Sequence, residues 1–180
     1  IGAVYVGTIV INGGTINVKG GTYAAGIGGD CHNKDGGIIT INGGVVNARG
    51  GRKAAGIGSG LGGVDGGWFK GGVCGNITIS GGIVNATCSR NSCGIGAGFA
   101  RCMNMTITIS GGTVTATGYH QGPGIGAGAA GSCGNIIISG GTVTATASTS
   151  NNSPSAAAGI GTGHASSSCG NITITTDVTK

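Results

Sequence analysis

Short apolar runs alternate with polar residues at period two along most of the chain, and glycine pairs separate these runs. In the segment 107–117 this alternation predicts two strands, each with aliphatic residues on one face and threonines on the other. A third apolar residue follows between glycines in Gly124-Ile125-Gly126. The same pattern occurs five times, so the chain is a repeat domain. The aliphatic face of this segment consists of Ile107, Ile109, Val114 and Ala116.

The repeats start near residues 8, 38, 76, 106 and 135, and a partial sixth starts at 171. Their Gly-Gly pairs are 30, 38, 30 and 29 residues apart. Extra residues at 60–72 and 147–155 fall outside the aliphatic positions, which predicts two loop insertions on a regular coil.

A period near 30 with three apolar segments predicts one turn of a three-sided parallel β-helix (β-solenoid). We therefore expect one all-β domain over 1–180, with about five coils stacked roughly 4.8 Å apart. The usual crossover preference predicts right-handed coiling. The absence of Glu and the single Leu disfavour a helical repeat. The first and last coils are expected to leave unpaired strand edges, so we expect either a piece of a longer array or ends that receive another molecule.

The composition narrows the function classes. Six aromatic residues are too few for a globular core of large side chains, and no apolar run is long enough to cross a membrane. The net charge of +5 is carried by sparse basic residues, whereas nucleic-acid binding requires clustered Lys and Arg with stacking aromatics. We therefore expect neither a nucleic-acid partner nor membrane insertion.

Seven cysteines without zinc-type spacing favour an oxidising compartment, and hence an extracellular or cell-surface location. Four of them precede the Ile-x-Ile strands of successive repeats, within disulfide reach of one another. They predict the pairs Cys74–Cys102 and Cys133–Cys169, or alternatively a column of small buried thiols. Cys88 and Cys93 are a third candidate pair, and Cys31 is left over as buried, free or intermolecular.

Two outward columns of polar residues follow each Gly-Gly pair. Exposed Thr and Asn are ordinary strand residues that bond along a stack, which is one interpretation. The other is a regular surface for a glycan or an ice lattice, because Thr-x-Thr rows resemble those of β-solenoid antifreeze proteins. The columns are Asn17, Asn47, Asn85, Thr115 and Thr144, and Lys19, Arg49, Thr87, Thr117 and Thr146.

Catalytic chemistry is poorly represented, so we expect no enzyme activity, no cofactor and no metal site. The chain has four Asp, no Glu and three His. Solenoid lyases and hydrolases need clustered carboxylates or a metal with a basic partner. The residues nearest to such a cluster are Asp30, His32, Lys34, Asp35 and Asp65.

Several units recur almost unchanged along the chain: Gly-Asn-Ile-Thr-Ile-Ser-Gly-Gly at 75–82, Ile-Ser-Gly-Gly-Thr-Val-Thr-Ala-Thr at 109–117 and 138–146, and Gly-Ile-Gly-Ala-Gly at 94–98 and 124–128. These units resemble repeats of large bacterial surface and secreted β-helix proteins. The resemblance covers 8–175 and implies a β-helix used as a stalk, an adhesin or a glycan-binding module. The leading hypothesis is a structural stalk or fibre subunit that assembles with itself, followed by a carbohydrate-binding module and, as a lesser alternative, an ice-binding protein.

Overall fold

The structure is a computed structural model of the 180-residue chain. It describes residues 7–30, 37–62, 64–65, 68–69, 72–99, 102–103, 105–148, 157–164 and 167–175. These residues form strands, turns and irregular segments, and none of them forms a helix that could cross a membrane.

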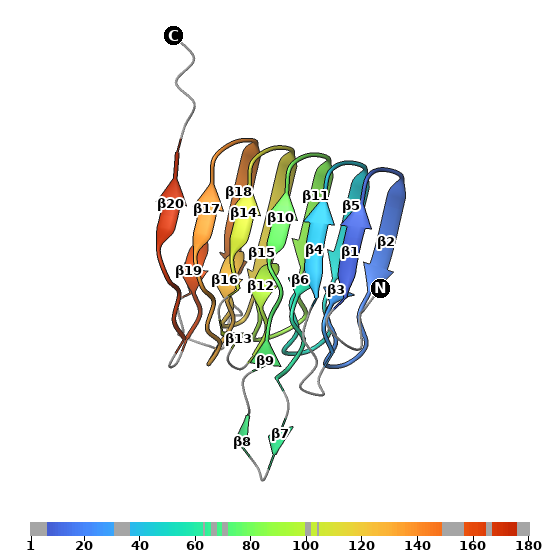
Figure 1. Cartoon of the computed structure of the whole chain (residues 1–180). Coiled ribbons are helices and arrows are strands. Elements are labelled where there is room, and N and C mark those ends of the chain that lie inside the picture. The colour runs from blue at the N-terminus through green and yellow to red at the C-terminus, as the bar shows by residue number, and fades with distance from the viewer. Residues whose placement is uncertain are drawn as a thin grey trace.

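Three parallel sheets form the three sides of a solenoid, as the sequence predicted (Figure 1). The first sheet contains β1 (Thr8–Ile11), β4 (Ile38–Ile41), β10 (Ile77–Ile79), β14 (Ile107–Ile109), β17 (Ile136–Ile138) and β20 (Ile172–Ile174). The second contains β2 (Thr15–Lys19), β5 (Val45–Arg49), β11 (Ile83–Thr87), β15 (Thr113–Tyr119) and β18 (Thr142–Ser148). The third contains β3 (Ile27–Gly28), β6 (Ile57–Gly58), β12 (Ile95–Ala97), β16 (Ile125–Ala127) and β19 (Ile160–Thr162).

Each strand pairs with its equivalent in the next coil, so like residues stack on like residues. In the first sheet Ile77 pairs with Ile107, and Ile79 with Ile109. The inward residues of the middle coils are fully buried, including those predicted for 107–117. In the outer coils some equivalent side chains, such as Ile9 and Val143, are only partly buried against the core, whereas Ile27 and Ile136 are fully buried. The core is therefore a set of aliphatic columns along the solenoid axis.

Glycine is required at the corner between the first and second sheets. The second glycine of each Gly-Gly pair has a φ between 83° and 90°, a conformation that side chains disfavour. In the fourth coil this residue is Gly112, with a φ of 84°. The repeated Gly-Gly pair thus makes the same turn in every coil.

The first insertion is more ordered than the predicted loop. Its strands β7 (Val64–Asp65) and β8 (Trp68–Phe69) pair antiparallel as a hairpin that projects from the solenoid (Figure 1). At its exit β9 (Gly72–Val73) pairs parallel with β13 (Cys102–Met103) of the next coil. At the second insertion β18 continues through Ser148, because Ala147 and Ser148 still pair with β15. The rest of that insertion, 149–155, lies outside the described residues.

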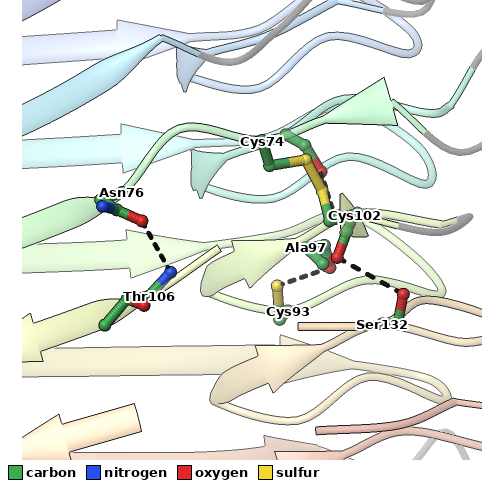
Figure 2. The surroundings of a disulfide bond; sticks show 9 residues. Cys74, Asn76, Cys93, Ala97, Cys102, Thr106 and Ser132 are labelled. Carbon is green, nitrogen blue, oxygen red and sulfur yellow. Dashed lines mark hydrogen bonds between the residues drawn. A yellow bond between two sulfur atoms is a disulfide. The ribbon is translucent and has the colours of Figure 1, made fainter. Parts of the chain in front are cut away.

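Two disulfides join neighbouring coils, in the pairs that the column of cysteines predicted. Cys74 is bonded to Cys102, with 5.3 Å between their Cα atoms (Figure 2). Cys133 is bonded to Cys169, with 4.7 Å between their Cα atoms. They close loops of 28 and 36 residues, for which the chain-entropy estimate is about 4 kcal/mol of stability each.

Replacement of Gly126 should be far more destabilising than replacement of a corner glycine with open surroundings. Gly126 has a φ of 133°, and an added Cβ would collide with the carbonyl oxygen of Gly161 in the next coil. Gly13 has nothing within 4 Å of such a Cβ. We expect Gly126→Ala to lower the free energy of unfolding by at least about 2 kcal/mol, and Gly13→Ala to change it by less than about 0.5 kcal/mol. Denaturant unfolding of both variants measures the difference, and equal midpoints would contradict the stacking geometry.

Candidate binding surface on the second sheet

The structure brings the ten predicted surface residues together as two adjacent columns on the second sheet. In the first column Asn17 pairs with Asn47, and Asn47 with Asn85. The ladder continues through Thr115 to Thr144. The second column lies two residues further along each strand, on the same face because side chains alternate. It contains, in register, Lys19, Arg49, Thr87, Thr117 and Thr146.

Hydrogen bonds connect the three asparagines of the first column into a ladder. Asn47 Nδ2 donates to Asn17 Oδ1 at 2.7 Å, and Asn85 Nδ2 donates to Asn47 Oδ1 at 2.8 Å. A similar ladder occurs before the Gly-Gly corner, where Asn42 Nδ2 donates to Asn12 Oδ1 at 2.8 Å. The asparagines therefore stabilise the stack while keeping further lone pairs and N–H groups for a ligand.

A shallow concavity of about 460 Å³ lies over this ladder. Its lining combines amides, cations and apolar surface, and comes from β2, β5 and β11. The residues are Asn17, Val18, Lys19, Asn47, Ala48, Arg49, Asn85 and Thr87.

The second sheet changes character between the third and fourth coils. Coils one to three contain the asparagine ladder and the two cations, whereas β15 and β18 present only threonines at the outward positions 113–117 and 142–146. The predicted surface is therefore two zones: an amide and cation zone, and a threonine zone that spans two coils.

Two further cations lie at the turn after the second sheet, and the predicted site residues did not include them. Arg52 and Arg90 are exposed and form a parallel bridge between the second and third coils. The offset of 38 residues that relates β5 to β11 also relates Arg52 to Arg90. Extending the repeat alignment past the strands into the turns would have found them.

Lys53, the next residue, is engaged elsewhere. Its Nζ lies 4.1 Å from the centroid of the Phe99 ring, a cation–π contact. Burial lowers the pKa of the Lys53 amine, and the neighbouring Arg52 lowers it further. Lys53 is therefore a structural residue of the turn.

The β-helix repeat profile matches five segments of this chain: 9–31, 39–61, 77–99, 107–129 and 136–164. Each segment begins in a strand of the first sheet and extends beyond the strand of the third sheet in the same coil. The chain belongs to the β-helix repeat family. No curated protein and no solved structure matches the chain.

One predicted disulfide of this β-helix repeat protein is wrong. Cys88 and Cys93 are free and buried. The Cys88 thiol donates to the carbonyl of Ser92 at 2.7 Å, and the Cys93 thiol donates to the carbonyl of Ala97 at 2.9 Å (Figure 2 shows the latter). Each sulfur is thus directed to a backbone acceptor. Closeness in sequence suggested the pair, but each thiol bonds a different backbone carbonyl.

Most of the candidate acidic cluster lies outside the described residues. Asp30 is half-buried and lies after β3. Asp65 lies in β7, where the structure describes only its backbone. His32, Lys34 and Asp35 lie outside the described residues, as does Cys31. Within the described part of the chain, no group of three or more His, Cys, Asp or Glu is placed to hold a metal ion.

Cys88 and Cys93 should resist alkylation in the folded β-helix repeat. Burial raises the pKa of Cys88 to about 11, and burial together with Cys88 raises the pKa of Cys93 further. Because the thiolate is the reactive form, iodoacetamide at pH 8 should leave both unmodified until the chain is unfolded without reductant. Peptide mass spectrometry measures the labelling, with Thr108→Cys on the outer face of β14 as a labelled control. A peptide linking Cys88 to Cys93 in the native protein would contradict this assignment.

Proposed function

We propose that this chain is a structural segment of an extracellular or cell-surface protein, namely a stalk or fibre subunit. The observation that carries the proposal is the unbroken register of three parallel sheets over five coils, reinforced by Cys74–Cys102 and Cys133–Cys169. Backbone hydrogen bonds run along the axis at every coil, which suits a rigid spacer. The disulfides support an oxidising location.

End-to-end association of copies is the second element of the proposal. β20 presents Ile172 and Ile174 with exposed fractions of 45% and 59%. Beside it lies a concavity of about 490 Å³ whose apolar side chains are Ile138, Val143 and Ile174. β1 at the other end of the same sheet has the same alternating isoleucines. A β20 edge joined to the β1 edge of the next copy is a head-to-tail contact, which builds filaments when it does not close into a ring.

The predicted assembly is a filament of constant width whose formation depends on Ile174. We expect filaments of the oxidised protein by negative-stain electron microscopy, and their loss with Ile174→Lys because a charge would enter the apolar contact. Thr173→Lys, on the outer face of the same strand, is the matched control. Monomers at every concentration, or filaments of Ile174→Lys, would refute end-to-end association. Immunogold labelling of native cells tests the surface location separately.

Carbohydrate binding is a second candidate function, favoured by the concavity over Asn17, Asn47 and Asn85. Amides at regular spacing on the outer face of the sheet can donate to and accept from sugar hydroxyls. Ice binding is a lesser candidate, supported by the threonine zone. We propose no catalytic role, because carboxylates and histidines are sparse in the sequence.

Asn47→Ala should weaken polysaccharide binding at least tenfold if the concavity is the site. Asn42→Ala is a matched control, because Asn42 also lies between two ladder partners, Asn12 and Ser80, but outside the concavity. A polysaccharide panel measured by affinity electrophoresis separates the two variants. Equal losses in both variants, or no retention of the unaltered protein, would count against this candidate.

A further inference from the structure

We propose that the turn edge of the second sheet binds an anionic polysaccharide, through a basic–aromatic strip that crosses the first four coils. The proposal rests on the carbohydrate-binding candidate and narrows its ligand to carboxylated or sulfated chains. The strip consists of Lys19, Tyr23, Arg49, Arg52, Arg90 and Tyr119.

The cations of the strip form two stacked pairs at one edge of the solenoid. Lys19 pairs with Arg49 at the ends of β2 and β5, and both side chains are exposed. Arg52 pairs with Arg90 in the turn. Arg52 is three positions after Arg49, so their Cα atoms are at most about 11 Å apart. Four cations thus lie within three adjacent coils.

None of these four cations forms an ion pair with a described residue. The cation next to them, Lys53, lies over Phe99, and the backbone N–H of Lys53 donates to the carbonyl of Arg90 at 2.8 Å. The turn therefore fixes the backbone beside the arginines, while Arg52 and Arg90 are exposed. Unpaired guanidinium groups bind carboxylates and sulfates through paired N–H donors.

Exposed tyrosines lie at both ends of the arginine pair. Tyr23 occupies the equivalent turn of the first coil, with an exposed fraction of 36%. Tyr119 ends β15 in the fourth coil with an exposed fraction of 41%, and its carbonyl accepts from the N–H of Asn91 at 3.0 Å. A tyrosine offers an apolar ring and a hydroxyl, which suits a sugar ring.

The arrangement fits a polysaccharide better than a nucleic acid. The four coils extend the strip over about 14 Å at a spacing of about 4.8 Å per coil. Nucleic-acid surfaces require more clustered cations than these four. The asparagine ladder adjoins the strip through Asn47, two residues before Arg49, and supplies hydroxyl-binding groups that a sugar chain needs.

Binding to matched neutral and anionic polymers tests the proposal. We expect dextran sulfate or alginate to bind the intact chain, with affinity falling as salt rises because exposed charges are screened. Unsulfated dextran should bind at least tenfold more weakly than dextran sulfate. Arg52→Gln/Arg90→Gln should weaken anionic binding at least tenfold. Thr8→Glu/Thr173→Glu, which changes the net charge equally on the outer face of the first sheet, should weaken it less than threefold.

Further binding measurements distinguish this proposal from its alternatives. Tyr23→Ala/Tyr119→Ala should weaken binding of alginate but not of inorganic polyphosphate. If the arginine and glutamate variants lost affinity for the anionic polymer equally, net charge alone would explain the binding, and the strip would be overturned. Tighter binding of duplex DNA than of dextran sulfate would also overturn it. The intact chain could instead bind neutral glycans but no anionic polymer, and Asn47→Ala could abolish that binding. This result would overturn the strip and leave the carbohydrate-binding candidate standing.

Discussion

The hydrogen-bond ladder between successive coils is the constraint on which the rest of the structure depends. Each strand pairs in parallel with its equivalent one coil away, so a residue type chosen once is repeated as a column. The narrow space between the three sheets accommodates columns of isoleucine, valine and alanine. At Gly126 the next coil is too close for any side chain. The low aromatic content and high glycine content follow from this geometry.

The same spacing determines which side chains can interact along the axis. Cα atoms about 5 Å apart suit a disulfide, and equivalent asparagines suit an amide ladder. The spacing between adjacent coils therefore permits both the Cys74–Cys102 disulfide and the hydrogen bond between Asn47 and Asn17. Cys88 and Cys93 lie in the same coil rather than in equivalent positions of neighbouring coils, so the spacing does not pair them. Their burial makes them weak acids and poor nucleophiles.

Surface chemistry changes along the solenoid although the core does not. The inward columns stay aliphatic from β2 to β18, while the outward positions pass from amides and cations to threonines. A scaffold that tolerates such variation can place different binding groups at a regular spacing. The turn after the second sheet adds to this variation in surface side chains, because Arg52 and Arg90 stack there outside the strands of the three sheets.

The sequence by itself determined the architecture, because period-two alternation repeated near every 30 residues leaves few other ways to bury the aliphatic positions. It also determined the outward columns, which follow from equivalent positions in adjacent coils, and two disulfides, whose cysteines precede the first-sheet strands of neighbouring coils. The right-handed coiling stays a prediction. Only the tertiary structure decided what depends on local geometry. It ordered the insertion as the β7–β8 hairpin and directed the thiols of Cys88 and Cys93 to separate carbonyls. Turns and insertions lack the repeated apolar pattern that fixes register, so their contacts emerge only when the coils stack.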